Sequence, residues 1–238
     1  MALYREDAIV LRTWKLGEAD RIVNLLTRGH GKVRAVAKGV RKTSSRFGAR
    51  LEPTSHVALQ LYQGRELDTI TQAESLATFR SIRGDFERFA KASTVLEAVD
   101  QIAQERHSAP RLHAMLLGVL RTLDGHDAPL VVPGFLLKLL ALEGLRPVVD
   151  ACAVCGTDDD LVAFDPIEGG VLCRAHRRGP AVSEEARRLL RLILGGQLGA
   201  ALNEPASPAT HEVAHLATEA MEHHLERRLR SATLLDRA

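Results

Sequence analysis

Three cysteines and one histidine form two closely spaced pairs in the C-terminal half of the chain. Cys152 and Cys155 are separated by two residues, and Cys173 and His176 repeat that spacing after a further seventeen residues. Two residues between ligands let both side chains of a knuckle reach one ion, and two knuckles complete the tetrahedron that zinc prefers. The pattern uses all three cysteines of the chain. It predicts one zinc ion held by Cys152, Cys155, Cys173 and His176.

The predicted zinc ion is structural because four protein ligands leave no coordination position for water. Gly156 and residues 168–170 supply turns that fold the two knuckles together, and Val162, Phe164 and Val171 indicate intervening strands. The alternative is that the thiols are free, buried cysteines beside an unrelated histidine. The paired spacing favours the metal site.

A second metal-type motif lies near the C-terminus. His211, Glu212 and His215 match the metalloprotease helix, in which two histidines bind zinc and the glutamate acts as general base. No Gly-x-x-His segment continues the motif, and Val213 and Leu216 place an apolar stripe on the same helix. A zinc-dependent hydrolase is therefore kept as an alternative, and we expect the protein not to be an enzyme.

Positive charge is concentrated at the N-terminal end. The first fifty residues contain twelve Lys and Arg against four Asp and Glu; since the whole chain carries +2, the remainder has a net charge of −6. Several cations along a groove are what phosphate binding needs. We expect the densest part, residues 38–50, to form a mobile loop beside the first domain. The predicted DNA-binding residues are Lys32, Arg34, Lys38, Arg41, Lys42, Arg46 and Arg50.

Few aromatic side chains accompany these cations. Trp14, Phe47, Tyr4 and Tyr62 are the aromatic residues available nearby, so readout of individual bases is not expected. No Walker-type phosphate loop is present. A solvated basic loop, or a scaffold that binds an acidic protein instead of DNA, is the alternative reading of the charge.

The first 77 residues predict a small β-barrel. Turn-forming segments separate five short strands, and residues 28–31 and 63–65 are hairpin connections. Five short strands cannot bury both faces as an open sheet, so we expect closure into an OB-type barrel. The expected strands span residues 8–13, 21–26, 32–37, 56–62 and 67–73.

From Thr78 the apolar period changes to that of helices. We expect helical stripes around Val95 and Leu116, a helix over residues 135–142 in the middle of the bundle, and a last helix that begins after Pro208 and runs through Leu229. The predicted class is α+β, with an OB-fold DNA-binding domain at residues 1–77. A helical domain follows at residues 78–238 and contains a zinc-binding insertion at residues 150–178.

The start of the chain is of mixed polarity and lacks the features of a secretory signal. The most apolar stretch, residues 130–142, is too short to cross a bilayer and is interrupted by Pro133, Gly134 and Lys138. We expect a cytoplasmic, nucleoid-associated protein with no membrane partner.

Several short segments carry a resemblance to a known family. In the order in which they occur, they are residues 8–11 (AIVL), 17–20 (GEAD), 25–27 (LLT), 31–32 (GK), 35–39 (AVAKG) and 45–48 (SRFG). Together with the knuckle pair they resemble the RecO family of bacterial recombination mediators, along the whole chain.

The resemblance implies a function in recombinational repair. It implies binding of single- and double-stranded DNA, annealing of complementary strands, association with RecR, and assistance in loading RecA onto DNA coated by single-strand-binding protein. It leaves open the oligomeric state, the helices that would contact RecR or single-strand-binding protein, and the preference for single or double strands. Many members of the family have a fourth cysteine where this chain has His176.

Overall fold

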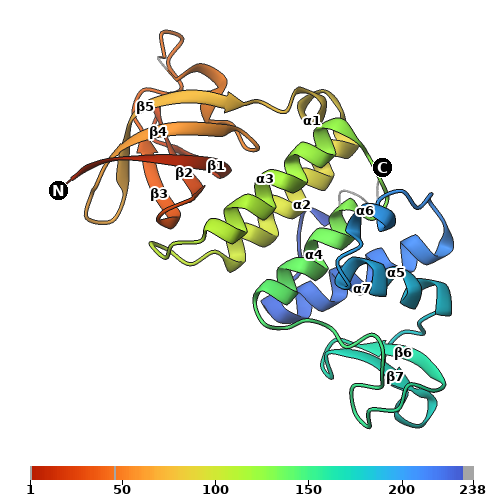
Figure 1. Ribbon diagram of the computed structural model, residues 1–238. Helices are drawn as coiled ribbons and strands as arrows, with labels where there is room; N and C mark the ends of the chain where they lie inside the picture. Colours follow the sequence, from red (N-terminus) through yellow and green to blue (C-terminus); the bar gives the residue numbers. More distant parts are fainter. Residues whose placement is uncertain (1, 46, 233–238) are drawn as a thin grey trace. The chain divides into compact units, whose positions relative to one another are not determined.

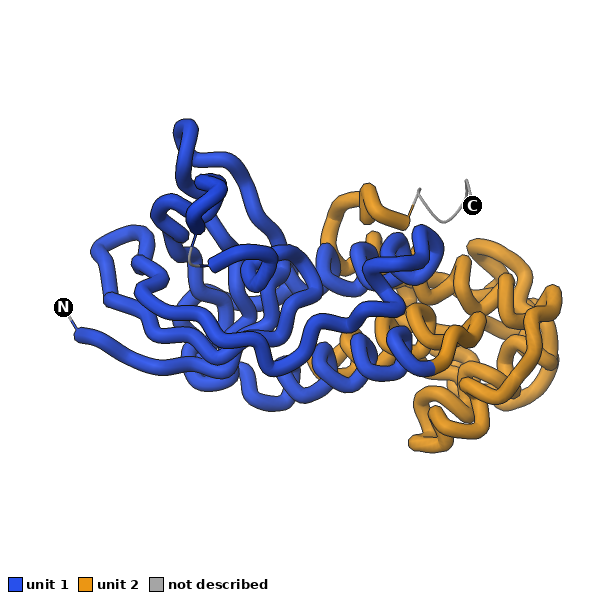
Figure 2. The backbone as a smooth tube through the Cα atoms, turned by 90° about the horizontal axis from the view of Figure 1, so that it is seen from above, with its two compact units in different colours: residues 1–125 blue, residues 126–238 orange. Residues whose placement is uncertain are grey.

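The computed structural model describes residues 2–45 and 47–232. The chain forms two compact units, one comprising residues 1–125 and the other residues 126–238 (Figure 2). Arg46, one of the predicted DNA-binding residues, lies outside the described residues. The two units are described in turn.

Five strands at the N-terminus form a closed barrel in the order β1-β2-β3-β5-β4 (Figure 1). All neighbouring strands are antiparallel except β3 and β5, which pair in parallel at Ala35 with Asp68 and at Val36 with Thr69. The predicted five-stranded barrel of OB type is confirmed, and each strand overlaps its predicted range. The strands are β1 (Leu3–Leu16), β2 (Asp20–Thr27), β3 (Gly31–Ala37), β4 (His56–Tyr62) and β5 (Asp68–Ala77).

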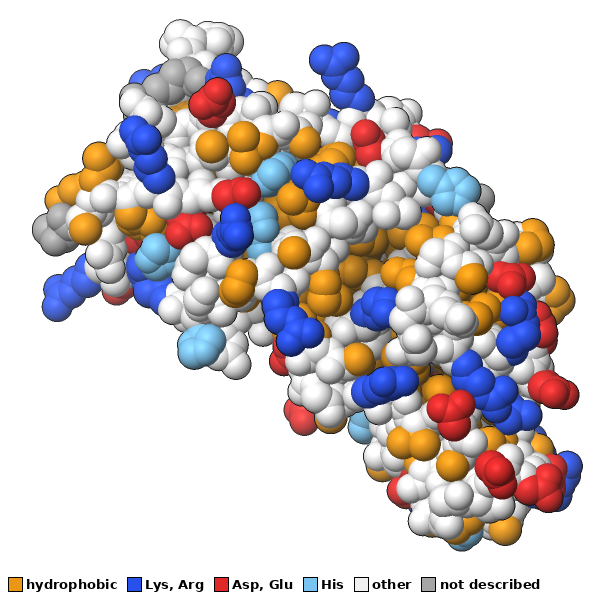
Figure 3. Space-filling view, viewed as in Figure 1, with side chains coloured by type: hydrophobic (Ala, Val, Ile, Leu, Met, Phe, Trp, Pro, Cys, Tyr) orange, Lys and Arg blue, Asp and Glu red, His pale blue; other side chains and the backbone are white. Residues whose placement is uncertain are grey.

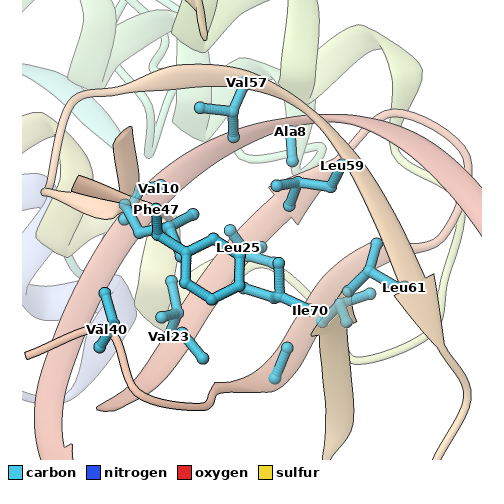
Figure 4. Close-up of a cluster of buried hydrophobic side chains, with 14 residues drawn as sticks. Ala8, Val10, Val23, Leu25, Val40, Phe47, Val57, Leu59, Leu61 and Ile70 are labelled. Atoms are coloured by element: carbon cyan, nitrogen blue, oxygen red, sulfur yellow. The ribbon is translucent and has the colours of Figure 1, made fainter. Parts of the chain in front are cut away.

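The barrel interior is filled by aliphatic side chains from alternate strand positions, as a pleated strand requires. Phe47 comes from the loop after β3, just before the short helix η1 (Gly48–Leu51), and points into this interior among Val10, Val23 and Leu25 (Figure 4). Its side chain is 1% exposed. The segment of residues 38–50, which was predicted to be a mobile loop, therefore contributes an anchor to the barrel core.

The two predicted hairpin connections join β2 to β3 and β4 to β5. Gly31 has a φ of +61°, and a Cβ atom there would lie 1.9 Å from the carbonyl oxygen of His107. Glycine is thus needed both for the left-handed backbone and for the close approach of the chain that precedes the third helix.

Asp68 at the start of β5 is a fully buried carboxylate. It accepts hydrogen bonds from the Tyr4 hydroxyl, from the Gly64 N–H at 3.0 Å, and from Arg106 Nη2 at 2.7 Å. Burial raises the pKa of Asp68, but the bonds from Tyr4, Arg106 and Gly64 outweigh it, so the pKa lies below its usual value. Burial and the Asp68 carboxylate together raise the pKa of Tyr4.

Three helices complete the first unit: α1 (Arg80–Gly84), α2 (Phe86–Ile102) and α3 (Pro110–Gly125). The Asp85 side chain caps α2 by accepting from the Arg88 N–H. Both α2 and α3 contact β1, and they pack against each other. The barrel and these helices thus form one compact unit. The predicted boundary between two domains at residues 77 and 78 stays a prediction.

The second unit is built around α4 (Val131–Leu142), which packs against α7 (Pro208–Leu225). Nearly every side chain of α4 is buried, as predicted for a central helix. Ser207 caps α7 in a capping box with Thr210. The prediction that this helix continues through Leu229 is wrong, because Glu226 adopts a left-handed conformation, with a φ of 52°, and ends it. The remaining helices are α5 (Glu184–Leu194) and α6 (Leu198–Ala201).

A two-stranded sheet of β6 (Leu161–Asp165) and β7 (Gly170–Cys173) is inserted between α4 and α5, followed by the short helix η2 (Arg174–His176). These strands contain the residues predicted to separate the two knuckles. Within residues 2–45 and 47–232, no helix combines the length and the apolar character needed to span a lipid bilayer.

Candidate metal centre and nucleic-acid interface

The segment that carries the first pair of cysteines is held against β7 by backbone hydrogen bonds. The Val148 N–H donates to Gly169 O at 2.9 Å, and the N–H of Val171 donates back to Val148 O at 2.8 Å. Ala153 N–H donates to Val171 O at 2.8 Å. A Cβ atom at Gly170 would lie 2.3 Å from Val148 O, so only glycine permits this close pairing.

The first knuckle turns back on itself immediately after Cys152. The Cys152 N–H donates to Thr157 O at 2.7 Å, the Gly156 N–H donates to Cys152 O at 2.8 Å, and Gly156 has a φ of +76°. On the other side, Arg174 pairs with Asp160 at 2.7 Å and its N–H donates to the Asp160 carbonyl at 3.0 Å. These bonds fix the two pairs of side chains opposite each other.

The structure brings all four predicted ligands together. The Sγ atoms of Cys152, Cys155 and Cys173 and one ring nitrogen of His176 all lie within 4.8 Å of one another. Cys155 Sγ is 3.9 Å from Cys173 Sγ, and Nδ1 of His176 is 3.8 Å from Cys152 Sγ and 3.3 Å from Cys173 Sγ. Tetrahedral zinc with metal–sulfur bonds of 2.3 Å separates two sulfur ligands by about 3.8 Å. These residues can therefore hold a metal ion, and the spacing and donor set suit zinc.

The surroundings of the thiol groups favour the thiolate form of one of them, Cys152. Burial raises the pKa of Cys152, but hydrogen bonds from the backbone N–H groups of Cys173, Cys155 and Val154 lower it to about 6 overall. For Cys155, a backbone hydrogen bond from Thr157 lowers the pKa, while burial and the neighbouring thiols of Cys152 and Cys173 raise it on balance. Cys152 is thus the first of the two to become a thiolate, which is the form that binds metal.

The histidines of the metalloprotease-like motif are not assembled into such a site. His211 and His215 are exposed on α7, and the Glu212 carboxylate accepts a hydrogen bond from the Ser183 N–H at 2.5 Å, just before α5. His215 Nδ1 instead lies 3.8 Å from Glu219 on the same helix. Among the described residues, neither histidine belongs to a group of three possible metal ligands. The motif is explained by the packing of α7 and its contact with the α5 N-terminus.

Four of the predicted DNA-binding residues are exposed on or directly after β3. Arg34 lies on the outer face of that strand, and Lys38, Arg41 and Lys42 follow in the turns that leave it. Arg41 Nη1 also donates to Gly17 O at 3.1 Å, which ties these turns to the connection between β1 and β2. Basic side chains are visible over the barrel, with carboxylates between them, in Figure 3.

The two remaining described residues of the predicted set have partners within the first unit. Lys32 Nζ donates to the Asp100 carbonyl near the end of α2 at 2.6 Å, so its charge neutralises a helix C-terminus. Arg50 is exposed, and its Nη1 donates to Phe47 O at 3.2 Å. Of the two, Lys32 is the less available to a ligand. The assignment of the whole set to DNA stays a prediction.

Two of the four aromatic residues expected near the cations have structural roles within the barrel. Phe47 is in the core, and Tyr4 is half-buried with its hydroxyl bound to Asp68. Trp14 and Tyr62 remain exposed. Arg12 stacks on Trp14 at 5.2 Å from the ring centre, an arrangement that places a cation and an aromatic ring on one strand face.

Arg12 was not among the predicted binding residues, although its position two residues before Trp14 indicates that both side chains lie on one face of a strand. Asn24 of β2 pairs with Arg12 of β1 on one side and with Arg34 of β3 on the other. The two arginines therefore lie two strands apart on the same outer face. The alternation of strand positions relates Arg12 to Trp14 in the sequence, but the register that aligns Arg12 with Arg34 comes from the barrel.

Fold and sites together define a class of protein. It is an α+β protein in which a five-stranded OB-type barrel with basic outer positions precedes a helical region that carries a three-cysteine, one-histidine cluster.

Two family models match almost the whole chain. The model described as Recombination protein O N terminal matches residues 1–79, and the model described as Recombination protein O C terminal matches residues 83–233. The chain therefore belongs to the RecO family, and the family predicted from short motifs is confirmed.

Full-length relatives agree with this assignment. The chain is 45% identical to the DNA repair protein RecO of Frankia casuarinae over 244 residues, covering all of both chains. It is 46% identical to that of a Nocardioides species and 39% identical to that of Bifidobacterium longum, with 99% of this chain and all of the relative covered in each case.

Proposed function

We propose that this protein is a DNA-binding recombination mediator. In this role it binds single- and double-stranded DNA, anneals complementary strands, and assists the loading of RecA, together with RecR, on DNA coated by single-strand-binding protein. Membership of a family whose relatives are named DNA repair proteins supports the biological setting. The observation that carries the DNA-binding part is the group of exposed cations on and after β3.

The charges of this surface suit a sequence-independent ligand. Arg34, Lys38, Arg41 and Lys42 are exposed, and the outer face of β1 adds Arg12 beside Trp14. Each phosphate neutralised by such a side chain releases counterions, which gives affinity that falls as salt rises. Contacts to phosphates leave the base edges free and reduce repulsion between two backbones. Annealing by this route needs no catalytic group.

The second part of the proposal is that Cys152, Cys155, Cys173 and His176 hold one structural Zn²⁺ ion. Three thiolates and an imidazole form a closed set, and Zn²⁺ bound there would supply cross-links and no reaction chemistry. The chain's own residues prepare the site, because the backbone amides around Cys152 favour its thiolate. We propose accordingly that the protein is not an enzyme and that it acts inside the cell on the nucleoid.

The first experiment measures the anisotropy of a labelled single-stranded oligonucleotide against salt, with zinc determined on the same sample. Changing Arg34, Arg41 and Lys42 together to alanine removes up to three phosphate contacts. We expect weaker binding at every salt concentration and a slope of log affinity against log salt that is shallower by roughly 2. The circular dichroism spectrum should not change, because the three side chains are exposed.

A matched control changes three other exposed cations, Arg111, Arg121 and Arg146, which lie outside the barrel. This variant carries the same loss of charge, so general electrostatic attraction falls equally while the proposed contacts remain. A control that loses as much affinity as the barrel variant would remove the assignment of the surface. Absence of binding by the parent at low salt would leave a scaffold that binds an acidic protein.

A further inference from the structure

A second cluster of possible metal ligands lies within the first unit, whose sequence contains no cysteine. Asp7 comes from β1, His56 from the first position of β4, and His113 from the first turns of α3. One carboxylate oxygen and one nitrogen from each ring lie within 4.8 Å of one another. The sequence separates these residues by 49 and 57 positions, so no local motif marks them.

Strand register and helix packing explain why these side chains meet. His56 pairs with Ile9 across β4 and β1, and Asp7 lies two residues from Ile9, on the same face. Ala8 and Val57, between them, point into the barrel core. Both α2 and α3 contact β1, and α3 brings His113 over the other two residues.

The hydrogen bonds within the first unit account for only two of the three residues. His56 Nε2 is hydrogen-bonded to Asp7 Oδ1. His113 Nε2 lies 3.3 Å from the same oxygen but lacks the geometry of a hydrogen bond, and among the described residues it has no hydrogen-bond partner. Because the His113 residue is only 3% exposed, bulk solvent does not hydrate this nitrogen. A buried ring nitrogen without a partner, directed at a carboxylate and a second imidazole, points to a ligand that all three share.

We propose that Asp7, His56 and His113 bind one divalent transition-metal ion of the zinc type. Two imidazoles and one carboxylate are a donor set that zinc and its neighbours accept. With metal–ligand bonds of 2.0–2.1 Å, tetrahedral ligands are about 3.3 Å apart, which is the separation between Asp7 Oδ1 and His113 Nε2. Asp7 Oδ1 and His56 Nε2 are closer together than this, and their separation would increase when both atoms coordinate the ion.

The surroundings permit ion entry and ligation. Burial lowers the pKa of His113, even though Asp7 acts in the opposite direction, and the neutral imidazole that this favours is the form that binds a metal. The side chain of Asp7 is 37% exposed, which opens the cluster to solvent on one side. Three protein ligands leave a fourth position for water. The bound ion would link β1, β4 and α3, and this inference does not depend on the proposed role in recombination.

The test uses untagged, full-length protein that has been stripped of metal and then given one molar equivalent of zinc, which the three-thiolate site takes up in preference. Titration with Co²⁺ is followed by calorimetry and by visible absorption. We expect the parent to take up one further ion, with the ligand-field bands of nitrogen and oxygen ligation and without a thiolate charge-transfer band. Asp7→Asn and His113→Gln should each abolish this uptake, whereas His107→Gln, an exposed histidine before α3, should retain it.

A second measurement covers the case in which His113→Gln fails to fold. Excess Co²⁺ should raise the melting temperature of the zinc-loaded parent and of His107→Gln, because an ion that binds only the folded state stabilises it. Asp7→Asn, which preserves the shape of the side chain, should show no such rise. The proposal is overturned if the zinc-loaded parent takes up no cobalt, or if Asp7→Asn binds it as the parent does.

Discussion

The barrel and the knuckle insertion at residues 150–178 are both small β-structures, but they are stabilised in different ways. The barrel closes on itself and encloses a cluster of fourteen buried apolar side chains, including Phe47. The insertion has two strands of five and four residues. Its ligand cluster lies beside a sheet too short to enclose a core of its own.

This difference separates two sources of folding free energy. Burial of apolar surface stabilises the barrel without the help of a bound ion. In the insertion, convergence of three thiolates is unfavourable unless a cation offsets their negative charge, and binding of the metal then contributes to folding directly. The effect of a mutation in the insertion on stability should therefore depend on whether metal is bound, whereas the effect of a mutation in the barrel should not.

The largest effect is expected for Cys152→Ser. Loss of one ligand removes much of a zinc-binding free energy on the order of 10 kcal/mol. We expect zinc to be lost and hydrogen exchange to become fast at residues 150–178, while the barrel amides keep their protection. Val154→Ser, an exposed residue of the same knuckle, is the control and should retain zinc. Identical melting curves for parent and Cys152→Ser, with or without chelator, would contradict a structural metal.

The next largest effect is expected for Phe47→Ala in the barrel. Removal of this fully buried ring leaves a cavity and should lower the free energy of unfolding by about 3–5 kcal/mol, measured by urea denaturation. The zinc content should not change. Phe86→Ala is the control, because that ring is 65% exposed and its loss should cost much less. Equal losses for the two variants would show that Phe47 does not pack in the interior.

The smallest effects come from a matched pair of aspartates that each bind an arginine, Asp68 in the barrel and Asp160 in the insertion. The hydrogen bonds of buried Asp68 hold its pKa below the usual value, so they stabilise the protein above about pH 4, and this stability is lost as the pH falls toward the lowered pKa. Asp68→Asn should cost about 1–3 kcal/mol at pH 7 and weaken the dependence on acid.

Asp160→Asn should change stability less, because the Asp160 and Arg174 side chains are largely exposed and water screens their attraction. The measurement for both variants is the urea midpoint between pH 3 and pH 7. Parallel pH profiles for the parent and Asp68→Asn would contradict the role given to the buried carboxylate.

The sequence by itself determined the features that depend on local spacing. Strand alternation and glycine turns predicted the five-stranded barrel, because a pleated strand with one buried face repeats every two residues. The spacing of Cys152 and Cys155, repeated at Cys173 and His176, predicted a cluster that the structure assembles. The apolar run over residues 135–142 predicted the central helix α4.

Only the tertiary structure decided which side chains those elements bring together. It placed Phe47 inside the barrel, engaged Lys32 with the end of α2, and packed α2 and α3 on β1, so that the compact unit extends to Gly125. It also united Asp7, His56 and His113 from three elements. Local patterns carry no record of such contacts, because the register between strands and the packing of a helix on a sheet depend on residues far apart in the chain.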